Sequence, residues 1–190
     1  MRLRNIPGAD AAITESVYCI KSPETHKGHW QEIFPSQQPL HIEIGMGKGR
    51  FMMDLAAVHP DINYLGIERY SSVLLRALQK MEENPLPNLF FICMDAADVA
   101  EVFDHGEVDR IYFFNPFSIE ILKKVLARVL ESYYENPREL LLFFYYPSDE
   151  YISYLMTVDE LIFSDEIDCR DLFPGENKRE RLSLIHISEP

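Results

Sequence analysis

After residue 38 the chain alternates between short apolar runs and amphipathic segments, and no other feature of the sequence limits its fold as strongly. The apolar runs have the length of strands, and the segments between them place apolar residues at helical spacing. Strands that alternate with helices form a mostly parallel sheet with helices on both faces. We therefore predict an α/β, Rossmann-like domain. The predicted strands are Leu40–Ile44, Ile62–Ile67, Leu89–Cys93, Val108–Phe114 and Leu140–Tyr146.

The segments between these strands stop where a helix is expected to stop. Pro60 follows the first segment and Pro85 follows the second, and proline cannot continue a helix because it lacks the backbone N–H. The strongest helical period lies in the second segment, where apolar residues recur at spacings of three and four. The predicted helices are Arg50–Val58, Ser71–Glu83, Val99–Phe103, Ser118–Tyr134 and Glu150–Met156.

Both ends of the chain differ from this pattern. Residues 1–38 are rich in proline and polar residues, so we expect an N-terminal arm with one short helix, anchored on the core by Trp30 and Phe34. The predicted domain then spans residues 39–181. Residues 182–190 resemble the in-frame translation of a transposon-end adapter used in sequencing libraries. We therefore expect this tail to be non-biological and the natural C-terminus to be missing.

The charge balance bears on the class of partner. The chain carries 31 acidic and 18 basic residues, which gives a net charge of −13. This balance by itself argues against a nucleic-acid partner, because phosphate binding requires a basic surface. The first 50 residues are nevertheless about neutral, so the acidity lies further along and a local basic surface remains open. The basic residues of this stretch are Arg2, Arg4, Lys21, Lys27, Lys48 and Arg50.

Cysteine spacing and hydropathy exclude several classes of protein. Cys19, Cys93 and Cys169 lie far apart with no CxxC pair, so neither a disulfide framework nor a metal site is expected. No apolar run approaches the roughly 20 residues of a membrane-spanning helix, and the N-terminus lacks the apolar stretch of a signal peptide. We expect a cytoplasmic protein with no membrane partner. His41, within the first strand, is expected to be structural.

The segment Glu43–Phe51 reads Glu-Ile-Gly-Met-Gly-Lys-Gly-Arg-Phe, which is a strand, a glycine-rich turn and the start of a helix. Glycines accept positive φ and let a ligand approach the backbone, and the helix N-terminus behind them offers free N–H groups. The spacing G-x-G-x-G differs from the dinucleotide pattern G-x-G-x-x-G and is the form common in methyltransferases. Glu43, Gly45, Gly47 and Gly49 are therefore candidate cofactor-binding residues.

Two further acids follow the next two strands. Glu68 lies about 20 residues after the last glycine, where nucleotide-binding folds carry an acid that accepts the ribose hydroxyls. A carboxylate suits this role because it has two acceptor oxygens and no donor. Asp95 follows the third strand, where an adenine amino group would arrive. Because the carboxyl ends of parallel strands meet at one edge of the sheet, we predict one site formed by Glu43, Glu68 and Asp95.

Several segments together resemble the bacterial tRNA (guanine-N7-)-methyltransferase family, and they run almost continuously through residues 1–112. The resemblance implies a class I methyltransferase in which Glu43, Glu68 and Asp95 bind S-adenosylmethionine. It also implies tRNA as the partner, with methyl transfer to N7 of a variable-loop guanosine. The segments are Met1–Arg4, Glu43–Arg50, Tyr64–Glu68, Val73–Leu78, Leu86–Leu89, Met94–Ala96 and Val108–Tyr112.

The family pattern changes after residue 112. Where the family carries Asp-Pro-Trp-Pro followed by basic residues, this chain reads Phe-Phe-Asn-Pro-Phe-Ser over residues 113–118. Asn115 stands near the place of the family aspartate, and it is our candidate catalytic and cofactor-contacting residue. Asn115-Pro116-Phe117 also resembles the Asn-Pro-Pro-Phe/Tyr motif of methyltransferases that act on amino nitrogens, in which the aromatic ring stacks on the substrate. An amino group or another unknown substrate is therefore an alternative target.

The second half of the chain suggests a further alternative. Residues 113–181 look like the second half of a different class I methyltransferase, as expected of a chimeric gene or a misassembled read joined near the fourth strand. An inactive chimeric or truncated chain is therefore the third hypothesis.

Overall fold

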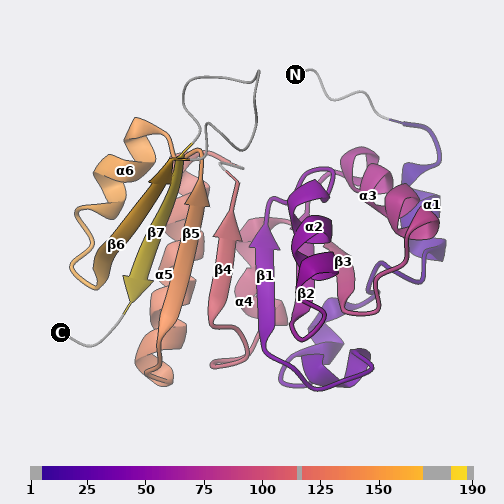
Figure 1. Cartoon of the computed structure of the whole chain (residues 1–190), viewed down its shortest axis with the longest axis horizontal. Coiled ribbons are helices and arrows are strands. Elements are labelled where there is room, and N and C mark those ends of the chain that lie inside the picture. The colour runs from indigo at the N-terminus through magenta and orange to yellow at the C-terminus, as the bar shows by residue number, and fades with distance from the viewer. Residues whose placement is uncertain (1–5, 115–116, 169–180, 188–190) are drawn as a thin grey trace.

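The structure of the chain is a computed structural model that describes residues 6–114, 117–168 and 181–187, with residues 167–168 and 181–187 described by their backbone alone. Its strands are β1 (Leu40–Ile44), β2 (Asn63–Glu68), β3 (Leu89–Cys93), β4 (Arg110–Phe113), β5 (Leu140–Tyr145), β6 (Leu161–Asp168) and β7 (Arg181–Ile187). Within the described residues they form one seven-stranded sheet in the order β3-β2-β1-β4-β5-β7-β6 (Figure 1). β1 to β5 are parallel, and β7 runs antiparallel between β5 and β6.

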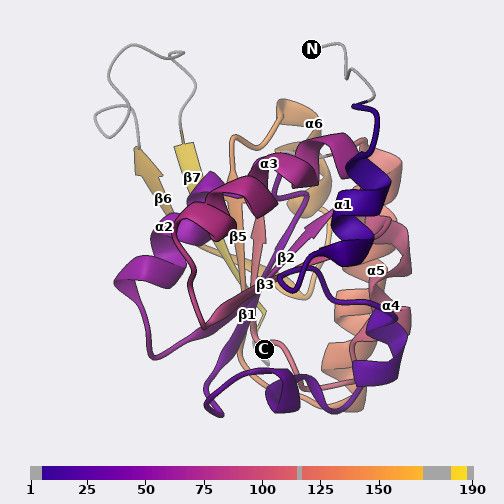
Figure 2. The same ribbon diagram turned by 90° about the vertical axis from the view of Figure 1, so that its right-hand side faces the viewer.

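Helices lie on both faces of the sheet. The α-helices are α1 (Ala9–Glu15), α2 (Arg50–Val58), α3 (Ser71–Glu83), α4 (Val99–Val102), α5 (Ile119–Glu135) and α6 (Asp149–Leu155). Short 3-10 helices are η1 (Pro23–His26), η2 (Trp30–Ile33) and η3 (Ala96–Asp98). Figure 2 looks along the sheet and separates α2 and α3 on one face from α4 and α5 on the other. In the described ranges no helix is both long and apolar enough to cross a membrane.

Two apolar clusters hold these layers together. Ile42 and Leu142 belong to the cluster beneath α4, α5 and α6, whereas Tyr64 and Phe91 belong to the cluster beneath α2 and α3. Successive side chains of a strand point to opposite faces, so the strands supply both clusters at once. The predicted parallel sheet with helices on both faces is therefore confirmed.

The N-terminal segment lies against this core. The N–H of Ile20 donates to the carbonyl of Phe91 at 2.8 Å, which places the segment alongside β3. Trp30 is 1% exposed, and its indole N–H donates to the Val102 carbonyl at 2.7 Å. Phe34 is also buried. The expected anchoring by the two aromatic residues is confirmed, and α1 is the short helix expected in this segment.

The ends of the predicted elements agree closely with the observed ones in the first half of the chain. The predicted helices Arg50–Val58 and Ser71–Glu83 coincide with α2 and α3, whereas β6 is absent from the prediction. Residues of the tail that we expect to be non-biological lie in β7. Strand formation there reflects the β-propensity of its apolar residues and does not bear on their origin.

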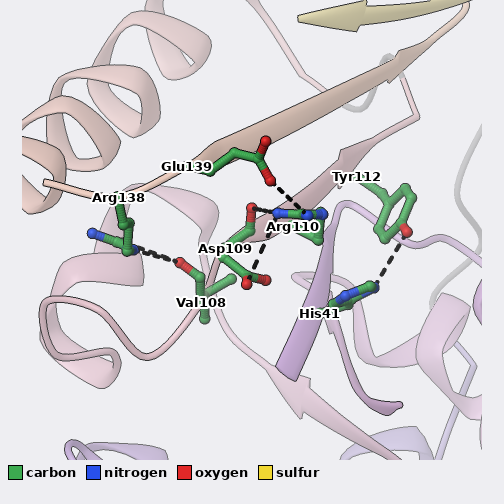
Figure 3. A network of polar contacts seen from close by, with 7 residues as sticks. All are labelled: His41, Val108, Asp109, Arg110, Tyr112, Arg138 and Glu139. Atoms are coloured by element: carbon green, nitrogen blue, oxygen red, sulfur yellow. Dashed lines mark hydrogen bonds and ion pairs between the residues drawn. The ribbon is translucent and has the colours of Figure 1, made fainter. Parts of the chain in front are cut away.

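A polar network lies near the amino ends of β1, β4 and β5 (Figure 3). The hydroxyl of Tyr112 is 3.3 Å from His41 Nδ1, and Arg110 pairs with Glu139 at 3.0 Å. Burial lowers the pKa of His41 to about 4, so its imidazole is neutral at physiological pH. This placement agrees with the structural role expected for His41.

Candidate active site

A cavity of about 640 Å³ opens at the carboxyl ends of β1, β2 and β3. Glu43, Glu68 and Asp95 all line it, together with Gly45 and Gly47. The structure therefore brings the three predicted acids together at the ligand edge of the sheet. Asn115, the candidate catalytic residue, lies outside the described residues.

The glycine-rich turn approaches the second strand closely. The N–H groups of Gly45 and Met46 both donate to the Ile67 carbonyl, at 2.8 and 3.0 Å. Gly45, Gly47 and Gly49 have φ values of 80°, 60° and 70°, a region that favours glycine. Gly49 is not among the lining residues. A Cβ there would lie 2.9 Å from that of Ala77 in α3, so Gly49 permits the close approach of two helices.

Glu68 connects the glycine-rich turn to the start of α3. Its Oε2 accepts from the Gly47 N–H at 3.0 Å, and its Oε1 accepts from the Tyr70 N–H at 2.9 Å. Burial raises the pKa of Glu68, although the backbone N–H groups act in the opposite direction. Each carboxylate oxygen has two lone-pair sites, so acceptor capacity remains on both oxygens for a ligand in the cavity.

Glu43 is the most unusual group of the cavity. Its side chain is 1% exposed, and its Oε2 is buried with no hydrogen-bond partner among the described residues. Burial, reinforced by the nearby charge of Glu68, raises the pKa of Glu43 to about 8. A buried acceptor without a donor is costly, so the cavity favours a ligand that brings a donor or a positive charge to Glu43.

Asp95 caps η3 and forms an ion pair at the cavity. Its Oδ1 accepts from the Ala97 N–H at 3.0 Å, and its Oδ2 lies 3.1 Å from Nη1 of Arg69. The Arg69 guanidinium also lies over the Tyr70 ring, 5.7 Å from its centroid. Asp95 is therefore held in a defined orientation by a backbone donor and a cation.

Basic side chains surround the mouth of this cavity. Lys48, Arg50 and Arg69 line it, and all three are exposed. The ammonium group of Lys80 donates to the Lys48 carbonyl at 3.0 Å, which adds a further positive charge beside them. This local concentration contrasts with the net charge of −13. We call Lys48, Arg50 and Arg69 the basic rim. The prediction missed Arg69, although its position directly after Glu68 could have indicated it.

Two aromatic residues beside Asn115-Pro116 have different environments. The ring of Phe117 packs edge-on against Phe113, with centroids 6.3 Å apart, and its carbonyl accepts from the Tyr151 hydroxyl at 2.6 Å. Phe114 is 42% exposed and lines the cavity as well. The amino-nitrogen hypothesis expects the Phe117 ring to stack on a substrate, yet Phe114 has the more exposed ring.

Comparisons with known proteins agree with this geometry. The model of the family described as "Putative methyltransferase" matches residues 37–136. The tRNA (guanine-N(7)-)-methyltransferase of Lachnoclostridium phytofermentans is 54% identical over 112 residues, which cover 59% of this chain and 52% of that protein. The enzyme of the same name from Geobacillus sp. is 50% identical over 113 residues, covering 59% and 51%. The chain thus spans about half the length of the curated relatives it matches, and the predicted family resemblance is confirmed.

Solved structures resemble the chain over nearly its whole length. An antibiotic-related methyltransferase has a TM-score of 0.61 at 18% identity, covering 88% of this chain and 96% of that one. A 30S ribosomal A1408 methyltransferase from an uncultured bacterium has a TM-score of 0.60 at 14% identity, covering 90% and 96%. At such identities the likeness concerns the fold, which is the Rossmann-like fold of class I methyltransferases.

Proposed function

Because the chain belongs to the methyltransferase family whose model matches residues 37–136, we propose that it transfers a methyl group from S-adenosylmethionine to N7 of a guanosine in the variable loop of tRNA. The observation that carries this proposal is the identity of 54% to a tRNA (guanine-N(7)-)-methyltransferase over 112 residues. The cavity lined by Glu43, Glu68 and Asp95 supplies a matching site.

The residues of the cavity fit S-adenosylmethionine. The buried Oε2 of Glu43 has no donor among the described residues, and the ammonium group in the methionine part of S-adenosylmethionine would supply one together with a positive charge. Glu68 retains acceptor sites for ribose hydroxyls, and Asp95 is oriented for an adenine amino group. A Cβ at Gly47 would meet nothing within 4 Å, so this glycine leaves room for the ligand against the backbone. When bound, S-adenosylmethionine supplies an electrophilic methyl group.

The chain's own residues have a limited chemical task. Guanine N7 carries a free lone pair, so no side chain has to remove a proton before the attack. The protein has mainly to hold the nucleophile in line with the methyl group, which is an effect of proximity and orientation. The methylated purine is a cation, and the carboxylate of Glu68 favours positive charge near the cavity. We assign no general base.

The basic rim supports tRNA as the substrate. Lys48, Arg50 and Arg69 are exposed beside the cavity, where they can contact the phosphates that flank a target nucleotide. A methyltransferase for a small molecule does not need this rim, so its presence favours a nucleic-acid substrate over a small amino compound. On this proposal the protein acts in the cytoplasm, together with its tRNA.

The deciding experiment measures methyl transfer from labelled S-adenosylmethionine to unmodified bulk tRNA, followed by nucleoside analysis. We expect labelled 7-methylguanosine. Label in a methylated amino group would favour the alternative that acts through Asn115-Pro116-Phe117. Calorimetry with S-adenosylhomocysteine runs in parallel. Cofactor binding without tRNA labelling would reject the proposed function, and absence of both would support an inactive chimeric or truncated chain.

A further inference from the structure

The ring of Phe114 lies at the boundary between the cavity and the uncovered half of the sheet. It directly follows β4, is 42% exposed and lines the cavity. Figure 1 shows that no helix of the described residues lies in front of β4 and β5 on the face that carries α2. The Phe114 ring is therefore partly exposed at the cavity, on the face of the sheet where it meets Phe51 of α2.

Neighbouring rings hold Phe114 in place. The register of β4 and β5 pairs Phe113 with Phe144, which brings the next residue, Phe114, beside Tyr145. The two ring centroids are 4.3 Å apart, and Tyr145 is only 9% exposed. Phe51 of α2 flanks Phe114 at 6.5 Å. A ring supported in this way can present a flat face without having to order itself when a ligand binds.

A second pair of rings continues this stack along the same strands. Tyr112 and Phe143 are stacked with centroids 4.7 Å apart, and Phe51 contacts Tyr112 edge-on at 5.5 Å. Tyr146, directly after β5, has a φ of 58°, an unusual conformation for a residue other than glycine. Strained backbone of this kind clusters at active sites and ligand clamps. The carboxyl end of β5 therefore has two features of a substrate-binding edge.

The chemistry of such a platform fits a flat ligand that becomes positively charged. Aromatic side chains stack on nucleic-acid bases whatever their sequence, and the face of an aromatic ring attracts a cation. Methylation at N7 turns a neutral guanine into a cation, so the attraction to the ring grows as the reaction proceeds. An interaction that strengthens towards the transition state accelerates the chemical step.

Resting on the proposed function, we propose that Phe114, backed by Tyr145, is the platform on which the target purine stacks, and that its ring favours the cationic N7-methylated base over the neutral base. The motif in the sequence pointed to Phe117 for such a role. Both rings line the cavity. Phe117 is half-buried against Phe113, so the greater exposure of the Phe114 ring assigns the role to Phe114 instead.

The test compares the binding of guanosine monophosphate and 7-methylguanosine monophosphate, each in the presence of S-adenosylhomocysteine. Phe114→Leu removes the ring and keeps an apolar side chain, whereas Phe114→Tyr keeps the ring. Phe163→Leu is the matched control. Phe163 is similarly exposed, at 49%, but it lies on the edge strand β6, which β5 and β7 separate from the strands that form the cavity. We expect the wild type to bind the methylated nucleotide about tenfold more tightly.

In Phe114→Leu this preference should fall to about one, while Phe114→Tyr and Phe163→Leu should retain it. The affinity for S-adenosylhomocysteine should be the same in all four proteins. An unchanged preference in Phe114→Leu, or no preference in the wild type, overturns the platform. A parallel loss of S-adenosylhomocysteine affinity also overturns it, because the ring would then belong to the cofactor site. A wild type that leaves tRNA unlabelled rejects the proposed function, whereas the nucleotide preference still decides the role of Phe114.

Discussion

The carboxyl edge of the sheet has two halves that differ in chemistry. At the ends of β1, β2 and β3 the cavity is lined by carboxylates, and Glu68 and Asp95 are oriented by backbone N–H groups. At the ends of β4 and β5 the side chains are aromatic, and Phe114 and Tyr145 orient each other by ring contact. We call these the acidic half and the aromatic half.

The two halves show two ways of orienting a binding group. In the acidic half, backbone N–H groups two residues along the chain donate to Glu68 and Asp95, so a local sequence pattern is enough to indicate these two carboxylates. In the aromatic half, orientation depends on which residues the strand register places side by side. The curated relatives match over 112 or 113 residues of this 190-residue chain. The two halves therefore also differ in how much of each is covered by similarity to these relatives. Substitutions in each half test this division.

The largest effect is expected at Glu68. Glu68→Gln places an amide NH₂ where one of two backbone N–H groups now donates, and hydrogen bonds to a charged group each contribute about 1.5–3 kcal/mol. We expect the affinity for S-adenosylhomocysteine to fall about 100-fold, as measured by calorimetry. Glu83→Gln, an exposed acid at the end of α3, is the control. An unchanged affinity in Glu68→Gln would remove Glu68 from the cofactor site.

The next effect concerns pH and Glu43. Its pKa of about 8 in the folded chain lies above the usual value of 4.5, so the folded state holds a proton that the unfolded state releases. The contribution of this proton to the free energy of unfolding is fully present below pH 4.5 and is lost as the pH rises through 8. Without cofactor, the wild type should lose on the order of 2 kcal/mol more than Glu43→Gln between pH 5 and pH 8. Urea unfolding of both proteins at pH 5 and pH 8 measures this difference. An equal loss of stability in the wild type and in Glu43→Gln would contradict the raised pKa of Glu43.

A smaller effect is expected when the support of the aromatic half is changed. An aromatic pair contributes about 0.5–1.5 kcal/mol beyond its buried area, so Tyr145→Leu should lower kcat/KM for tRNA methylation about fivefold. Tyr145→Phe keeps the ring and should lose less activity than Tyr145→Leu. Cofactor affinity should not change in either variant, because the acidic half is left intact. A loss of cofactor affinity in Tyr145→Leu would mean that the two halves are not independent.

The smallest effect is expected at the basic rim. Lys48→Ala should weaken tRNA binding about threefold and reduce the slope of log affinity against log salt by about one, because one phosphate contact is lost. Lys124→Ala is the control, since Lys124 is exposed on α5 and absent from the cavity lining. Filter binding at several salt concentrations provides the measurement. Identical slopes for the two variants would remove Lys48 from the tRNA surface.

The sequence by itself determined the layout of the first half. The alternation of strands and helices, with prolines at the ends of helices, predicted α2 and α3 residue by residue. It also predicted that Glu43, Glu68 and Asp95 meet at one edge, because parallel strands bring their carboxyl ends together. These features depend on residues close in sequence and on the periodicity of regular elements.

The tertiary structure alone decided which of these groups have partners and which are exposed. The pairing of Arg69 with Asp95 and the contact of the Phe114 ring with Tyr145 join residues from different strands or turns. The burial of Glu43 Oε2, which has no donor among the described residues, likewise depends on the neighbouring strands. The edge position of β6 also depends on β7, with which it pairs. Contacts of this kind follow from strand register and helix packing, which act over long sequence separations and leave no periodic signal in the chain.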